Sequence, residues 1–236
     1  MSCVDLMHDI LSNETFRFLG DVSEGRDKPW FDANRARYEA HVLEPMRALA
    51  ETVARPLAAR IPDLETQPAI NKMLTRIHRD MRFAPKGASP YKDHMLALFY
   101  RQGRKKKDPQ LFVGVQPKEI WMGLYLGPER IAAGSPMARA VAERPEAVVA
   151  LGRACGVGDA LTLAACKRYG EVVATFAGGE AGDYLQGPHL CALARRSAEV
   201  VAADPERCVA DAARILTGLI PLWSAYGEGP FNEDAC

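Results

Sequence analysis

The chain has 236 residues with 30 basic and 30 acidic side chains, so its formal net charge is zero. Hydrophobic residues make up 48% and charged residues 25% of the chain, a composition that excludes an intrinsically disordered protein. The zero total argues against binding of polyanions over the whole surface, but the charge is uneven. Residues 61–118 carry 12 bases and 5 acids, a net charge of +7, between flanks of −2 and −5.

Residues 1–9 contain two acids and neither a basic nor an apolar region, so we expect no secretory signal peptide. No stretch approaches the roughly 18 apolar residues that a membrane helix needs. The six cysteines include no Cys-x-x-Cys pair, which favours reduced thiols over a disulfide framework or a zinc cluster. We therefore expect a cytoplasmic protein without a membrane partner.

The first quarter of the chain predicts helices within residues 13–60. Asn13 is expected to cap a short helix, and Asp27 to cap a longer one with Pro29 in its first turn. Pro45 is expected to break or kink that helix. The segment after it has apolar residues at i, i+3, i+7 and i+11, which indicates an amphipathic helix: Met46, Leu49, Val53 and Leu57.

The following part predicts an antiparallel sheet within residues 72–126. Its four candidate strands are residues 74–83, 94–101, 111–115 and 120–126. Only short links separate these strands, whereas parallel pairing needs a long crossover. We therefore predict an antiparallel meander packed against the N-terminal helices.

Residues 128–226 are expected to be mostly helical, ending in a long helix that Asp204 caps and Pro205 begins. Two helices and one short strand pair are expected before it, at residues 128–143, 145–155, 161–166 and 171–176. No low-complexity linker divides the chain. We therefore predict one α+β domain over residues 1–236.

Eleven basic residues lie between Lys72 and Lys107, opposed only by Asp80 and Asp93. If residues 74–83 form a strand, its period of two puts Arg76, His78, Asp80 and Arg82 on one face and Arg79 on the other. Asp80 would orient the neighbouring side chains, and two oriented guanidinium groups suit a phosphate or a carboxylate.

Two alternatives stay open for these residues. The same side chains can form an internal Arg–Asp network in a structural or protein-interaction module. Asp80, Asp93 and His94 can also serve as acid, base or metal ligands of a hydrolase, if the loop between them brings them together. No metal-binding or nucleophile motif accompanies them, so we expect no metal and no cofactor.

The run Arg104–Lys107 falls in a predicted hairpin turn. Because a turn exposes its side chains to water, we prefer to interpret this run as a solvated loop. A contact with nucleic acid is the alternative.

Several motifs resemble those of a widespread bacterial family, the domain of unknown function numbered 2461. The resemblance covers roughly residues 14–226 and rests on five ordered elements. They are Phe16-x-Phe18-Leu19, Trp30-Phe31-x-x-Asn34-Arg35-x-x-Tyr38-Glu39, Glu44-Pro45-Met46, Arg76-Ile77-x-Arg79-Asp80-x-Arg82-Phe83 and Ser89-Pro90-Tyr91-Lys92-x-His94. The resemblance implies a single α+β domain and no particular activity. This chain departs from the family pattern in the lead-in 25–31 and in the loop 86–92.

The charge pattern and the resemblance together indicate one ligand-binding site. We expect it to bind an anionic small molecule or a nucleic acid, with or without turnover. Its predicted residues are Asn34, Arg35, Arg76, Arg79, Asp80, Arg82, Tyr91 and Lys92.

Overall fold

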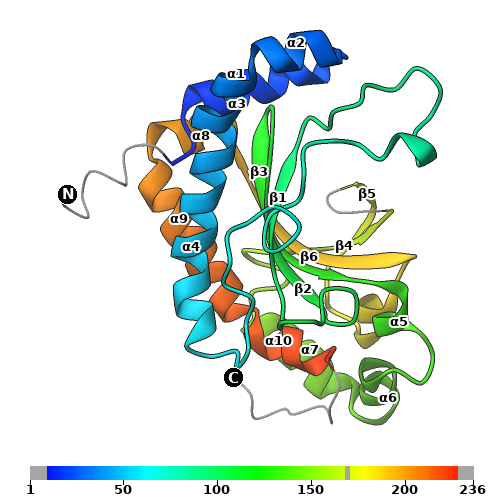
Figure 1. Ribbon diagram of the computed structural model, residues 1–236. Coiled ribbons are helices and arrows are strands. Elements are labelled where there is room, and N and C mark those ends of the chain that lie inside the picture. The colour runs from blue at the N-terminus through cyan, green and yellow to red at the C-terminus, as the bar shows by residue number, and fades with distance from the viewer. Residues whose placement is uncertain (1–9, 168–170, 228–236) are drawn as a thin grey trace. The chain divides into compact units, whose positions relative to one another are not determined.

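The computed structural model describes residues 10–167 and 171–227 (Figure 1). Helices and one antiparallel sheet make up these residues, which confirms the α+β prediction. Six strands are hydrogen-bonded in the order β1-β2-β3-β6-β4-β5. The chain divides into two compact units, residues 1–99, 113–120 and 195–213 in the first and residues 100–112, 121–194 and 214–236 in the second. That the chain is a single domain stays a prediction.

Helices fill the N-terminal part, and the capping residues explain where they begin. The elements are α1 (Asn13–Ser23), α2 (Lys28–Ala33), α3 (Arg35–Tyr38), a π-helical turn η1 (Glu39–Leu43) and α4 (Glu44–Ala58). The Asp27 side chain accepts the Trp30 amide at 3.0 Å, as predicted. The cap of α1 is Ser12, one residue before the predicted Asn13, and the Ser12 amide donates to the Thr15 hydroxyl at 3.1 Å.

Pro45 does not break the helix. The chain stays helical from Arg35 to Ala58, because the wider π turn of η1 comes directly before the proline and accommodates it in the first turn of α4. The stripe of four apolar residues predicted on α4 is fully buried, and α4 packs against β1.

The predicted strand 74–83 is wrong. Only three isolated bridges involve this segment, Leu74 with Ile70, Leu74 with Ala97 and His78 with Tyr91, and the segment ends in the 3-10 turn η2 (Met81–Phe83). The reason is local: the Asp80 carboxylate accepts the Arg82 amide at 3.2 Å, and such a side-chain contact turns the chain out of an extended ladder. The alternation consequently fails beyond Asp80, where Met81 and Phe83 are exposed.

The three later strands of the predicted meander are confirmed as β1 (Met95–Phe99), β2 (Gln110–Gln116) and β3 (Glu119–Leu126). Two more strands match the predicted pair, β4 (Thr162–Cys166) and β5 (Val172–Phe176). The sixth strand, β6 (His189–Ser197), was not predicted and pairs antiparallel with β4.

The three helices predicted for residues 128–226 are wrong in number: the structure has six α-helices among the residues that it describes there, and the predicted final helix is divided between α9 and α10. The stretch 128–143 contains two short helices, α5 (Pro128–Ile131) and α6 (Pro136–Glu143). The other elements are α7 (Pro145–Ala154), a 3-10 turn η3 (Ala181–Leu185), α8 (Ala198–Ala203), α9 (Pro205–Gly218) and α10 (Ile220–Ala225). Within the second unit, the Tyr226 hydroxyl donates to the Tyr184 carbonyl at 2.6 Å, and the Tyr184 hydroxyl donates to the Gly178 carbonyl at 3.2 Å.

Four cysteines are buried: Cys155, Cys166, Cys191 and Cys208. Cys3 and Cys236 lie outside the described residues. Within residues 10–167 and 171–227, every helix is too short or too polar to cross a lipid bilayer.

Gly152 on α7 provides a test of this packing. A Cβ at Gly152 would stand 1.7 Å from the hydroxyl oxygen of the fully buried Tyr184. We expect Gly152→Ala to lower the free energy of unfolding by about 1–3 kcal/mol, as overpacked cores do. Gly20 on α1 is the matched control, because a Cβ there meets nothing within 4 Å. We expect Gly20→Ala to raise the free energy of unfolding by about 0.5–1 kcal/mol. Urea denaturation measures both, and a stabilised Gly152→Ala variant would contradict the packing.

Candidate functional site

Three aromatic rings from distant parts of the sequence meet in the first unit. The rings of Phe31 and Tyr91 are stacked, with centroids 4.1 Å apart and planes 11° apart. The His78 ring lies 5.1 Å from the Tyr91 ring and 5.7 Å from the Phe31 ring. The His78–Tyr91 bridge explains this meeting, together with the hydrogen bond from the Lys92 amide to the Ile77 carbonyl at 2.8 Å.

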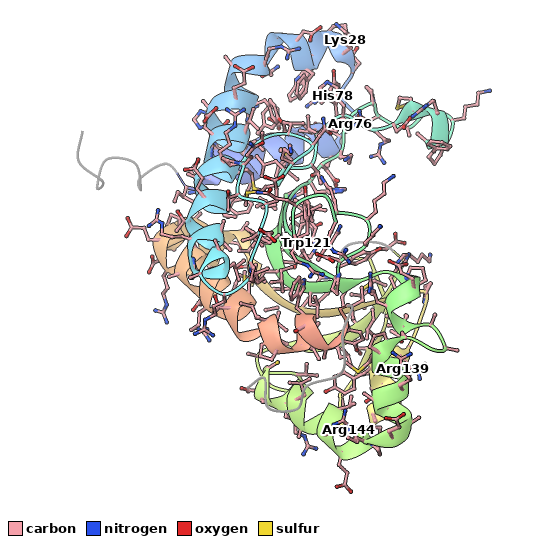
Figure 2. The ribbon with its side chains drawn as sticks, turned by 60° about the horizontal axis from the view of Figure 1, so that its bottom comes forward. Lys28, Arg76, His78, Trp121, Arg139 and Arg144 are labelled. Carbon is pink, nitrogen blue, oxygen red and sulfur yellow. The ribbon has the colours of Figure 1, made fainter. Side chains whose placement is uncertain are left out.

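Cationic side chains surround these rings. The Arg35 guanidinium lies 5.9 Å from the centre of the Phe31 ring, and the Lys92 ammonium donates to the Arg76 carbonyl at 2.8 Å. Figure 2 shows Lys28, His78 and Arg76 in the same part of the first unit. We call this group the basic–aromatic cluster; it consists of Lys28, Phe31, Asp32, Arg35, Arg76, His78, Tyr91 and Lys92.

Asp32 is the acid of the cluster, and Lys28 and Arg35 share it. Both form ion pairs with its carboxylate, the Arg35 pair at 3.0 Å. Their hydrogen bonds hold the pKa of Asp32 below its usual value. Arg76 differs, because its exposed guanidinium has no acidic or carbonyl partner among the residues that the structure describes. The cluster therefore contains four cationic side chains and one carboxylate.

The excess positive charge acts on the other titratable groups. Burial lowers the pKa of His78, and the charges of Arg35, Arg76 and Lys92 lower it further against the opposing charge of Asp32. Burial also lowers the pKa of Lys92, and the charges of Arg76 and Arg79 add to that shift. The positive electrostatic potential that lowers the pKa of these two groups also favours the binding of an anion at the cluster.

The structure separates the eight predicted site residues into two groups. It brings Arg35, Arg76, Tyr91 and Lys92 together in the basic–aromatic cluster. Asn34 lies on the same turn as Arg35, but its side-chain amide donates to the Trp30 carbonyl at 2.9 Å between α2 and α3.

The other three predicted residues have partners of their own. The Arg79 guanidinium donates to the carbonyls of Ser89 at 3.0 Å and Tyr91 at 3.3 Å, so it links the two ends of the loop that contains η2. Asp80 and Arg82 form a two-pronged ion pair at 3.0 and 2.7 Å on the exposed turn. These contacts match the internal-network alternative for Arg79, whereas the Asp80–Arg82 pair lies at the surface.

Lys28, Phe31, Asp32 and His78 belong to the cluster although they were not predicted as site residues. Lys28, Asp32 and Arg35 follow one another at i, i+4 and i+7, which places three ionisable groups on one helical face. That spacing is a readable signal. His78 was expected to share a face with Arg76, and its contact with Tyr91 depends on the bridge.

The other candidate groups are arranged differently. Arg101 and Arg104 bind the buried Asp108 at 2.8 and 2.7 Å in the second unit, and Lys106 and Lys107 of the same turn are exposed. Asp93 contacts His94 at 3.0 Å. In the part of the chain that the structure describes, no three His, Cys, Asp or Glu side chains are close enough to share a metal ion.

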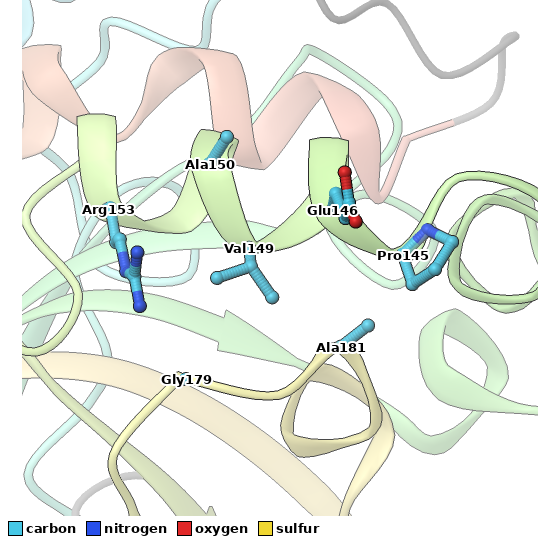
Figure 3. A pocket seen from close by; sticks show the side chains of 7 residues that line it. All are labelled: Pro145, Glu146, Val149, Ala150, Arg153, Gly179 and Ala181. Carbon is cyan, nitrogen blue, oxygen red and sulfur yellow. The ribbon is translucent and has the colours of Figure 1, made fainter.

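The second unit contains a pocket of about 380 Å³ between α7 and residues 179–181 (Figure 3). Val149 and Arg153 point from α7 towards this segment, and Glu146 lies nearer the start of the helix. The lining combines one base, one acid and small apolar groups. None of the eight predicted site residues belongs to it.

Comparison with known proteins gives a family and no relative of known activity. The family model described as "Conserved hypothetical protein (DUF2461)" matches residues 14–132, half of the chain, so the chain belongs to this family. The matched residues include the whole basic–aromatic cluster. No curated protein and no solved structure matches the chain.

Arg79 and Arg82 allow the two kinds of arginine contact to be compared by experiment. We expect Arg79→Ala to lower the free energy of unfolding by about 1.5–3 kcal/mol, because two carbonyls lose a charged donor. The Arg82 side chain is 79% exposed, and its ion pair with Asp80 is open to solvent. We therefore expect Arg82→Ala to leave stability unchanged. Chemical denaturation of both variants measures the difference, and equal losses would contradict the assignment of Arg79 as the loop's anchor.

Proposed function

We propose that this member of the DUF2461 family binds a ligand that carries a phosphate or carboxylate group, with the basic–aromatic cluster as its site. One observation supports this most directly. Arg76 presents an exposed guanidinium without a counter-ion among the described residues, beside two further cations that lower the pKa of His78. A planar guanidinium with free donors suits the oxygens of either anion.

The rest of the cluster would orient such a ligand. Phe31 and Tyr91 are both buried and stacked, so they form a rigid base beneath His78 and the cations. Arg35 and Lys28 share the carboxylate of Asp32. We expect the Arg35 guanidinium to move towards a bound anion and to form a second contact with it. Lys92 is held by the Arg76 carbonyl and contributes long-range charge. The six cysteines include no Cys-x-x-Cys pair, which suits a reducing compartment, so we place this binding in the cytoplasm.

The alternatives account for fewer of these contacts. An internal network explains Arg79 but leaves Arg76 without a role. A hydrolase built on Asp80, Asp93 and His94 would need them to converge, whereas Asp80 is bound by Arg82 and Asp93 by His94. Binding is therefore the function that the geometry supports best, and we propose no reaction.

Removal of the Arg76 charge tests the site. We expect Arg76→Gln to weaken the binding of inorganic pyrophosphate about tenfold, the loss of one charge-assisted contact. Arg55→Gln is the matched control, because Arg55 is an exposed arginine on α4 outside the cluster. We expect it to bind pyrophosphate as the wild type does. Isothermal titration calorimetry measures both, and equal weakening in the two variants would show binding by net charge alone.

The lowered pKa of His78 predicts a pH dependence. Burial and the neighbouring cations lower the pKa of His78 from its ordinary value, so the free protein favours the neutral imidazole at pH 7. A bound anion favours the protonated imidazole, so affinity should rise as the pH falls from about 7.5 to about 5.5. Sulfate is the appropriate probe, since its own charge is constant over this range. We expect His78→Gln to abolish most of the rise, and an unchanged pH profile in that variant would exclude His78 from the site.

A further inference from the structure

The turn η2 exposes an unusual amount of apolar surface. Phe83 is 82% exposed and Met81 is 47% exposed. Across residues 10–167 and 171–227, these two are half of the exposed large hydrophobic side chains, the others being Val173 and Val200. Figure 1 shows the turn, in teal, at the outer end of the long loop that precedes β1.

Local contacts fix the turn that carries these side chains. The Asp80 carboxylate caps the Arg82 amide, and the Phe83 amide donates to the Asp80 carbonyl at 3.3 Å. At the base of the loop, Arg79 links the carbonyls of Ser89 and Tyr91. The exposed Phe83 ring is therefore presented by an ordered turn.

The charge around this ring indicates an anionic partner. The Arg82 guanidinium lies 5.5 Å from the centre of the Phe83 ring. Residues 76–92 carry five bases and one acid, the bases being Arg76, Arg79, Arg82, Lys86 and Lys92. The partner should combine a flat apolar face with repeated negative charges, as unpaired nucleotides do.

We propose that the η2 loop and the basic–aromatic cluster bind single-stranded nucleic acid. A base stacks on Phe83 beside Arg82, and the phosphates of the same strand contact Lys86 and Arg76. This inference rests on the proposed function, because it identifies the anion at the cluster as a phosphodiester. Single strands fit better than duplexes because a duplex hides the faces of its bases. They also fit better than an anionic membrane, because two apolar side chains on one turn offer little area for insertion.

The test compares three nucleic acids of equal length with the full-length protein. Fluorescence anisotropy follows the binding of labelled oligothymidylate, an abasic strand and a duplex at about 50 mM salt. We expect wild-type protein to bind oligothymidylate at least fivefold more tightly than the abasic strand. We expect Phe83→Ala to lose this preference, with roughly 5- to 100-fold weaker binding of oligothymidylate, the usual effect of one lost stacking contact.

Two further variants keep the test specific. Phe83→Trp should retain the affinity, and its new indole should be quenched by oligothymidylate but not by the abasic strand. Val200 is the matched control, an exposed apolar residue of the same unit that lies far from Phe83 in sequence. We expect Val200→Ala to bind all three nucleic acids as the wild type does.

Failures of the two proposals are distinguishable. If all three nucleic acids bind equally and Phe83→Ala changes nothing, the cluster binds phosphate and the stacking inference is wrong. If Phe83→Ala weakens binding to phosphatidylserine vesicles but not to oligothymidylate, the partner is a membrane surface and the inference is also overturned. If neither pyrophosphate nor oligothymidylate binds, both proposals fail.

Discussion

The candidate site depends on a short stretch of backbone pairing between residues 75–79 and residues 90–96. The Thr75 amide bonds to the Leu96 carbonyl, the Lys92 amide to Ile77 and the Arg79 amide to Pro90, at 2.9, 2.8 and 2.7 Å. This pairing places His78 against Tyr91, and Tyr91 in turn stacks on Phe31 of α2. Because Pro90 has no amide hydrogen to donate, the ladder has no next bond to form at this point. The chain between Arg79 and Pro90 is therefore released as a loop, while its two ends are held together.

The same constraint explains why the arginines of this region differ in role. Arg79 lies at the point where the pairing stops, so its guanidinium reaches backbone carbonyls that no strand satisfies. Arg76 lies within the paired part, and its side chain is exposed to solvent. Arg82 lies beyond the pairing and finds its partner two residues away, in Asp80. Position relative to the ladder decides whether each charge is structural or available to a ligand.

Much of the fold could be predicted from the sequence, because capping residues and apolar periodicity act locally. Asp27, the stripe on α4 and the strands of the meander are examples. The same signals gave a wrong strand at residues 74–83. The alternation of residue types there is regular, but a single hydrogen bond to the Asp80 carboxylate turns the chain out of the extended conformation. The strand β6 escaped prediction because its Ala residues have little β-propensity, and pairing with β4 stabilises the strand. The family pattern was expected over residues 14–226, and the family model matches residues 14–132.

The site was predictable as a region and not as a set of contacts. Sequence places arginines, but the partner of a guanidinium can be a residue ten or more positions away, as Ser89 is for Arg79. Burial is the usual fate of a phenylalanine, so the amino-acid sequence does not indicate that Phe83 is exposed. Keeping such a ring in water is unfavourable to folding, and the turn that holds it there is ordered by its own hydrogen bonds and by Arg79. The ordered turn does not bury the ring, so the stability of the fold does not explain why the ring is exposed. Contact with a partner provides an explanation that accounts for both the exposed ring and the bases beside it.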